Sequence, residues 1–182
     1  TQKIFMDFWD VPSNDPRRSR EGTYFSKDYI IENNKIKVIG LDTRYFRSKL
    51  LGSRTNRQPN NNLKSSILGR SQLSWLANEL NDPKTEIFII LSSIQVLATE
   101  HGYEKWANFP HERDKLINLL QRKKNILILS GDRHRGAIYK HNKIIEITAS
   151  SMNKPGSSDN EIDKLMQGRI HKEINYGILV IK

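Results

Sequence analysis

The sequence predicts an α/β fold, with a parallel βαβαβ core and antiparallel hairpins at the ends. Three apolar segments, residues 36–41, 87–91 and 126–129, have the length and composition of buried strands. Two segments with leucines at helical spacing, residues 71–81 and 108–124, separate them. Strands joined by a crossover helix run parallel in one sheet. The order of these five elements therefore indicates the fold class.

The first hairpin is predicted over residues 27–42, with a polar turn at residues 32–35. The helix over residues 71–81 is expected to begin with Ser71 as its N-cap, and the Asn-Asp-Pro sequence at residues 81–83 is expected to end it. The side chains expected to face the core from this helix are Leu73, Leu76 and Leu80.

The second helix, residues 108–124, has Pro110 at a suitable first position and Glu112 in its first turn. The basic residues 122–124 are expected in its last turn, where cations suit the helix dipole. The side chains expected to face the core from this helix are Leu116, Ile117, Leu119 and Leu120.

The other parts of the chain are predicted to form a further hairpin, two loops and a last strand. Residues 137–148 predict a hairpin, and residues 52–64 predict a polar surface loop. A second polar loop is expected over residues 150–172, followed by a last strand over residues 176–181.

Length and composition exclude several classes of protein. The chain has 182 residues, enough for one domain with a core, and no Cys, which excludes a disulfide framework and a thiolate metal site. Its longest apolar run, residues 87–91, is too short to cross a bilayer, so no membrane span is expected. The first residues have neither an initiator Met nor the pattern of a signal peptide, so we expect the chain to be part of a longer protein.

The chain is basic, with a formal net charge of +10, which suits nucleic acid or another anionic partner. Two observations argue against nucleic acid. The basic residues are spread along the whole chain, and the bias toward Ile, Lys and Asn, with only 5 Ala, is typical of AT-rich coding.

A polar cluster follows each of the three buried strands. The clusters are residues 42–44, 92–95 and 130–135. The carboxyl ends of parallel strands line one edge of a sheet, which is where open α/β folds place their sites. We therefore expect the three clusters to converge there.

The third cluster has the most reactive residue types. Asp132 and His134 are two positions apart, so in an extended segment both side chains leave the same face. Such a pair suits a metal ion or general acid–base catalysis, although a Gly-Asp turn followed by a surface His is also a common arrangement. Arg133 and Arg135 alternate with the pair and could hold an anionic substrate group.

Two further features have competing interpretations. Asp42 and Arg44 are expected to form a local salt bridge, with a site as the alternative. His101 lies in a predicted loop and fits either a structural or a functional role.

Six segments resemble the PhoD-like (alkaline phosphatase D) metallophosphatases, and they occur in the same order along nearly the whole chain. They include the Leu-Asp-Thr-Arg-Tyr-Phe-Arg segment, the Ser-Ser-Ile-Gln-Val segment and the Leu-Ser-Gly-Asp-Arg-His segment. The six are residues 40–48, 68–76, 91–96, 101–113, 129–134 and 173–177.

The resemblance implies a calcineurin-like phosphoesterase fold that hydrolyses phosphate esters by attack of a metal-activated water. By this analogy His134 is a metal ligand and Asp132 a ligand or its neighbour, both in the catalytic centre, and Arg44, Arg133 and Arg135 bind substrate. The implied cofactors are calcium with iron, and the wider superfamily also uses zinc or manganese.

The resemblance also implies that residues 1–182 are a single partial domain, the C-terminal half of the metallophosphatase sandwich. The acidic metal motifs of the family would lie before Thr1, in a missing N-terminal half of the domain. We expect little activity from the chain alone, because a minority of the ligands binds metal weakly. Family members are often exported, so the resemblance leaves a periplasmic or extracellular location open, and any signal peptide would lie before Thr1. The alternative function is a non-catalytic module that binds anions or nucleic acid with the same half-fold.

Overall fold

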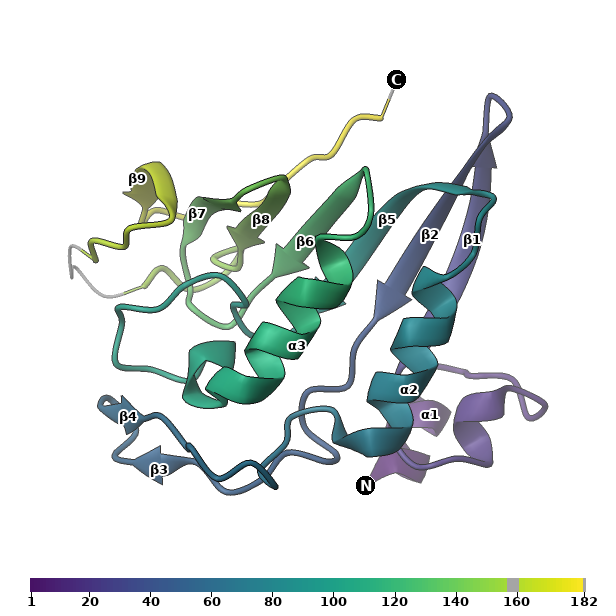
Figure 1. Cartoon of the computed structure of the whole chain (residues 1–182), viewed down its shortest axis with the longest axis horizontal. Coiled ribbons are helices and arrows are strands. Elements are labelled where there is room, and N and C mark those ends of the chain that lie inside the picture. Colours follow the sequence, from purple (N-terminus) through teal and green to yellow (C-terminus); the bar gives the residue numbers. More distant parts are fainter. Residues whose placement is uncertain (157–160, 182) are drawn as a thin grey trace.

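The computed structural model describes residues 1–156 and 161–181. Within them, seven strands form one mixed sheet in the order β1-β2-β5-β6-β8-β7-β9 (Figure 1). The strands β2, β5, β6 and β8 run parallel, and antiparallel strands complete both edges. The strands of this sheet are β1 (Phe25–Ile31), β2 (Asn34–Gly40), β5 (Thr85–Ser92), β6 (Ile126–Ser130), β7 (Gly136–His141), β8 (Ile144–Ala149) and β9 (Met166–His171).

The helices α2 (Gly69–Leu80) and α3 (Pro110–Leu120) lie against one face of this sheet (Figure 1). They supply the two crossovers that connect β2 to β5 and β5 to β6, so the predicted parallel βαβαβ core is confirmed. The other elements are α1 (Gln2–Phe8), the 3-10 turns Pro16–Arg18 and Trp106–Asn108, and the short hairpin of β3 (Leu51–Gly52) and β4 (Arg57–Gln58).

The hydrophobic core lies between the sheet and the two helices. Leu76 and Leu80 from α2, together with Leu116 and Leu120 from α3, are buried as the spacing predicts. Trp106, in the turn before α3, is also fully buried and donates a hydrogen bond from Nε1 to the Ser92 hydroxyl at 3.1 Å. The expected Leu73 and Leu119 are only partly buried.

The ends of both helices differ from the sequence prediction. The helix α2 begins at Gly69, two residues before the expected N-cap Ser71, and the Ser66 hydroxyl accepts a hydrogen bond from the Gly69 N–H at 2.7 Å. Just before this helix, Glu112 of α3 accepts hydrogen bonds from the N–H groups of Ile67 and Leu68 at 2.6 and 3.0 Å. The helix α3 ends at Leu120, so the basic residues 122–124 lie after its last turn. A contact between residues 45 positions apart, such as that of Glu112 with Ile67, cannot be read from local sequence.

The last part of the chain is organised differently from the prediction. The expected loop over residues 150–172, of which residues 157–160 lie outside the described part, contains β9. This strand pairs with β7 at the exposed edge of the sheet, which explains why its sequence is largely polar. The predicted strand over residues 176–181 is wrong: this segment has no strand partner, and its neighbour Asn175 forms one isolated bridge, with Ser151.

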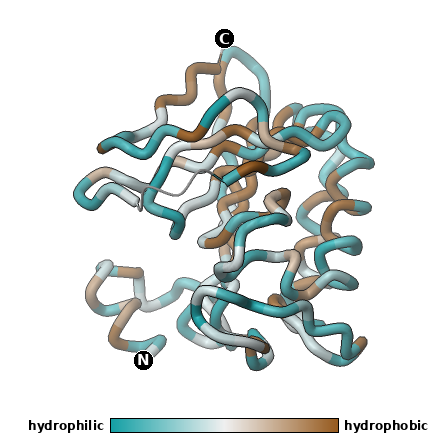
Figure 2. The backbone as a smooth tube through the Cα atoms, turned by 90° about the vertical axis from the view of Figure 1, so that its left-hand side faces the viewer, coloured by the Kyte–Doolittle hydropathy of each residue, from teal (hydrophilic) through white to brown (hydrophobic). Residues whose placement is uncertain are grey.

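The face of the sheet opposite α2 and α3 remains partly exposed. Ile138 and Ile145 on this face are 46% and 39% exposed, and the apolar residues Ile178 and Leu179 near the C-terminus are also exposed. Figure 2 shows hydrophobic colouring along part of the backbone that leads to the C-terminus. In the described part of the chain, no helix is long and apolar enough to cross a membrane.

Candidate active site

The three polar clusters converge at the carboxyl ends of the parallel strands, as predicted. The hydroxyl groups of Thr43 and Ser93 are hydrogen-bonded to each other and connect the first two clusters. Thr148 at the end of β8 connects the second and third: its hydroxyl contacts that of Ser130 at 2.9 Å and accepts a hydrogen bond from Gln95 Nε2 at 2.9 Å. The polar edge of the sheet is thus one continuous network.

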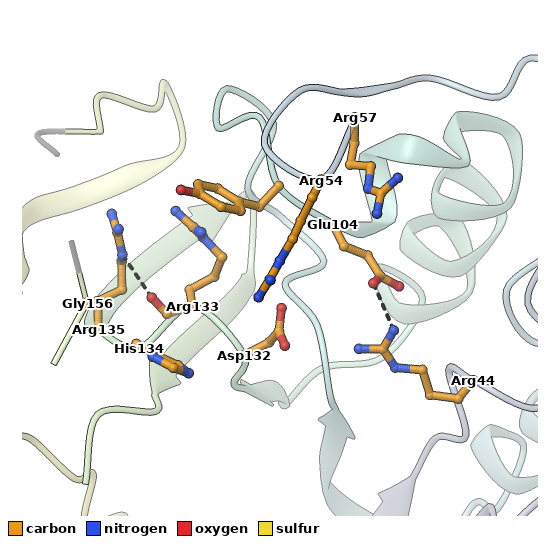
Figure 3. Close-up of a pocket in the computed structure, with 10 residues that line it drawn as sticks. Arg44, Arg54, Arg57, Glu104, Asp132, Arg133, His134, Arg135 and Gly156 are labelled. Atoms are coloured by element: carbon orange, nitrogen blue, oxygen red, sulfur yellow. Dashed lines mark hydrogen bonds and ion pairs between the residues drawn. The ribbon is translucent and has the colours of Figure 1, made fainter. Parts of the chain in front are cut away.

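Above this edge lies a cavity of about 410 Å³ with a strongly cationic wall (Figure 3). Its side chains come from four segments that are far apart in sequence: the loop after β2, the β3–β4 hairpin, the loop after β5 and the turn after β6. The ionisable residues that line it are Arg44, Arg54, Arg57, Tyr103, Glu104, Asp132, Arg133, His134 and Arg135.

Asp132 and His134 both line this cavity, but not for the predicted reason. The segment is a tight turn rather than an extended strand: both residues have left-handed backbone, with φ of 70° and 50°. The Arg133 N–H donates to the Gly131 carbonyl at 2.9 Å within this turn. Left-handed backbone costs on the order of 1 kcal/mol at a residue other than glycine, and such strain is common at functional sites.

The side chains of Asp132 and His134 are exposed and form no hydrogen bond or ion pair with the other described residues. Arg133 and Arg135, in contrast, are 7% and 1% exposed and both form ion pairs with Glu161, the Arg135 Nη1–Glu161 Oε2 distance being 3.0 Å. The turn therefore places its acidic and imidazole groups in the open cavity and its two guanidinium groups in the wall.

The positive charge of the wall is partly balanced. Burial, reinforced by the neighbouring Arg135, lowers the pKa of Arg133 to about 10, so this guanidinium still carries its charge at neutral pH. Its guanidinium carbon lies 4.1 Å from the centroid of the Tyr103 ring, a cation–π contact. One carboxylate, Glu161, thus serves two buried cations.

The predicted local salt bridge between Asp42 and Arg44 is not formed. Asp42 instead accepts hydrogen bonds from the N–H groups of Arg44 and Tyr45, both at 2.9 Å, and from Thr23. Arg44 extends into the cavity and pairs with Glu104 at 2.8 Å (Figure 3). The short Asp42 side chain binds its own turn, because main-chain donors lie closer to it than the guanidinium group.

His101 is a buried, neutral group behind the cavity wall. Burial, together with the charges of Arg133, Lys105 and Arg135, lowers the pKa of His101 to about 2. Its Nδ1 accepts a hydrogen bond from the Tyr103 N–H at 3.1 Å, which leaves the ring proton on Nε2. Between the two roles open in the sequence, these contacts fit the structural one.

A metal ion in a protein is usually held by three or more side-chain donors that lie close together. In the described ranges, residues 1–156 and 161–181, no group of three or more His, Asp or Glu side chains is placed to hold a metal ion. Asp132 and His134 are two suitable donors that share one cavity and are not engaged elsewhere in the described chain. Two donors are fewer than the three or four protein ligands of a typical metal site, so among the described residues Asp132 and His134 fit only part of one.

Comparison with known proteins decides the family. The model of the PhoD-like phosphatases matches residues 32–177, most of the chain. The chain belongs to the PhoD-like phosphatase family. No curated protein matches it in sequence.

Solved structures share the fold of this PhoD-like chain. The structure of PhoD aligns with a TM-score of 0.63 and 19% identity, over 81% of this chain and 34% of that one. GAP50, described as the anchor in the inner membrane complex of Plasmodium, aligns with a TM-score of 0.56 and 12% identity, over 84% of this chain and 44% of that one. The chain therefore spans less than half the length of either structure.

Four charged residues at the cavity of this PhoD-like chain were not predicted from the sequence. Arg54 and Arg57 lie in the segment predicted as a surface loop, and the acidic partners of the arginines are Glu104 and Glu161. The spacing of Arg54 and Arg57, with two residues between them in a polar loop, is a pattern that could have indicated an anion-binding role. The acidic partners were not predictable, because their contacts span 60 and 28 positions of the sequence.

Proposed function

We propose that this chain forms the phosphate-binding wall, and part of the metal site, of a metal-dependent phosphoesterase. The observation that carries the proposal is the placement of Asp132 and His134 in one cavity with five arginines, at the carboxyl ends of the parallel strands. Membership of the PhoD-like phosphatases supports it.

In this proposal three of the five arginines, Arg44, Arg133 and Arg135, bind and orient the phosphate ester. The guanidinium of Arg44 is held at the cavity by Glu104, and those of Arg133 and Arg135 are held by Glu161. The Arg44 side chain is about half exposed and has N–H donors for phosphoryl oxygens, and the charges of the buried Arg133 and Arg135 stabilise the negative charge that develops on those oxygens during hydrolysis.

Asp132 and His134 would hold the metal. A carboxylate with an imidazole suits hard and borderline ions, which agrees with the calcium, iron, zinc or manganese that the family resemblance implies. Bound metal ions supply Lewis-acid charge and an activated water to phosphoesterases. The exposed side chains of Asp132 and His134 are available for this role without breaking a contact in the described chain.

We further propose that the missing ligands belong to the N-terminal half of the domain. The chain covers 34% of the PhoD structure, and its described residues bring only two donors together at the cavity. A metal held by two protein ligands is weakly bound, so the chain alone should hydrolyse phosphate esters slowly or not at all.

The test compares the 182-residue chain with the full product of its reading frame. Both are assayed with p-nitrophenyl phosphate and bis(p-nitrophenyl) phosphate, with calcium, iron, manganese or zinc added. We expect turnover only by the longer protein, its loss with a chelator, and a decrease in kcat of about 10- to 100-fold or more in His134→Asn. His141→Asn, at the end of β7 and outside the cavity, is the matched control.

Three results would contradict this proposal. Full activity of His134→Asn in the longer protein, or activity that survives metal removal, would exclude the metal-ligand role of His134. Turnover by the 182-residue chain alone that depends on His134 would show that its metal site is complete.

A second candidate is a non-catalytic module that binds anions. It is favoured by the likeness to GAP50, which is described as an anchor, and by the cationic cavity wall. In this case binding of a polyanion should weaken steeply as salt is added, and the full product of the reading frame should show no metal-dependent turnover.

A further inference from the structure

The β3–β4 hairpin brings two arginines to the cavity that no part of the proposed mechanism uses. Arg54 lies between the two strands, and Arg57 is the first residue of β4. Figure 3 shows the Arg54 side chain extending from the hairpin into the cavity, toward Asp132 and Arg133.

The hairpin is held in place by the loop after β5. The Arg57 N–H donates to the Gly102 carbonyl at 2.6 Å, and a Cβ atom at Gly102 would lie 2.2 Å from the Thr55 carbonyl oxygen. Only glycine permits this approach of the two backbones. Tyr103 and Glu104 of the same loop line the cavity, so the hairpin and the cavity wall are one connected structure.

The arginines of the cavity differ in how their charge is balanced. Arg44, Arg133 and Arg135 each pair with a glutamate. Arg54 forms no hydrogen bond or ion pair with another described residue, and within the described part of the chain the side chain of Arg57 has one hydrogen bond, from Nη1 to the Gly52 carbonyl at 3.0 Å. In the described chain, the hairpin therefore adds two positive charges that no acidic side chain neutralises.

The size of the cavity fits more than one phosphate group. A volume of about 410 Å³ is within the range of pockets that enclose organic ligands, roughly 300–1,000 Å³. Asp132 and His134, on one side, face the reacting phosphoryl group in the proposed function, and the hairpin approaches from another segment of the wall.

We propose that Arg54 and Arg57 form a second anion subsite, which binds a further phosphate group covalently linked to the one that reacts. The substrate class would then be diphosphates and phosphate esters with a neighbouring phosphate, rather than esters with a single phosphate. The substrate assignment rests on the proposed function, whereas the second anion subsite itself does not.

The experiment measures binding of two probes, orthophosphate and pyrophosphate, to the 182-residue chain by calorimetry at low salt with chelator present. We expect pyrophosphate to bind at least about 10-fold more tightly than orthophosphate, since the hairpin arginines can donate charge-assisted hydrogen bonds to its second phosphate group. Arg54→Gln should remove most of this preference and leave the orthophosphate affinity within about twofold.

Three further variants separate the possible causes. Arg70→Gln removes the same charge from an exposed position of α2 outside the cavity, and should leave the preference intact. Arg44→Gln should weaken both probes alike. Gly102→Ala keeps every charge but displaces the hairpin, and should reduce the preference as Arg54→Gln does.

The outcomes distinguish the two proposals. Equal affinity for the two probes, or an equal effect of Arg54→Gln and Arg70→Gln, overturns the second subsite and leaves the proposed function standing. Binding of neither probe overturns the subsite and also removes the phosphate-binding role of the wall. A preference that is lost only in Arg54→Gln and Gly102→Ala supports the subsite.

Discussion

Two groups of ionisable side chains lie at the same end of the sheet and differ in their partners. The first group consists of buried carboxylates, each of which accepts hydrogen bonds from at least two backbone N–H groups of a neighbouring loop. They are Asp42, Glu112, Glu146 and Asp163. The second group, Asp132 and His134, is exposed and has no such partner among the described residues.

The difference shows that the buried carboxylates are committed to structure, whereas the side chains of Asp132 and His134 have no structural partner in the described chain. The buried carboxylates satisfy loop N–H groups that would otherwise be unpaired, and they fix the loops that carry the cavity. Glu146, for example, holds the N–H groups of Val96 and Leu97 at 2.9 and 2.5 Å, directly after β5. Unpartnered side chains on a strained turn remain free to bind a ligand.

Within the group of buried carboxylates, the pKa shifts also differ in direction. Burial alone would raise the pKa of Asp42, but hydrogen bonds from the N–H groups of Tyr45, Thr23 and Arg44 outweigh it and lower the pKa below its usual value. At Glu146, which is fully buried, burial prevails over the hydrogen bonds and raises the pKa. The number of hydrogen-bond donors and the degree of burial together decide whether the pKa of a buried carboxylate is raised or lowered.

The largest effect is expected from Glu112→Ala. It leaves the N–H groups of Ile67 and Leu68 buried without an acceptor, which should lower the free energy of unfolding by about 3 kcal/mol. Urea denaturation measures the loss. Asp114→Ala, an exposed acidic position of the same helix, is the control and should cost much less. Equal losses would show that Glu112 does not hold the start of α2.

An intermediate, pH-dependent effect is expected at His101. Its pKa is about 2 in the folded chain against 6.5 for the ordinary group, so the unfolded chain takes up a proton that the folded chain does not. The stability from neutral His101 is therefore complete above pH 6.5 and decreases by about 1.4 kcal/mol per pH unit below it.

His101→Gln keeps an acceptor for the Tyr103 N–H but cannot be protonated. Denaturation between pH 6.5 and pH 5 should therefore give a flatter stability curve for the variant than for the parent. Parallel curves would show that His101 takes up its proton without unfolding.

The smallest effect on stability is expected from Asp132→Asn and His134→Asn. Asparagine tolerates left-handed backbone, and neither substitution removes a partner among the described residues. The free energy of unfolding, measured by thermal denaturation, should therefore change by no more than about 0.5 kcal/mol. A loss as large as that of Glu112→Ala would place these residues in the structural group and remove the distinction.

Much of the fold could be predicted from local pattern. The apolar runs predicted the strands β5 and β6. As expected, a polar turn joins β1 to β2, and Glu32 and Asn33 in this turn have positive φ. The predicted strand over residues 176–181 failed because an apolar segment forms a strand only when another strand offers it hydrogen bonds. The polar β9 was missed because an exposed edge strand needs no apolar face.

The sequence by itself determined the α/β class, the parallel order of the central strands and the gathering of polar residues at one edge, because these follow from short-range periodicity and chain connectivity. Only the tertiary structure decided which of those residues are bound and which are free. Glu161 pairs with Arg133 across 28 positions, Glu104 with Arg44 across 60, and the hairpin carries Arg54 to the cavity. Such contacts depend on where distant loops meet, which local sequence does not encode.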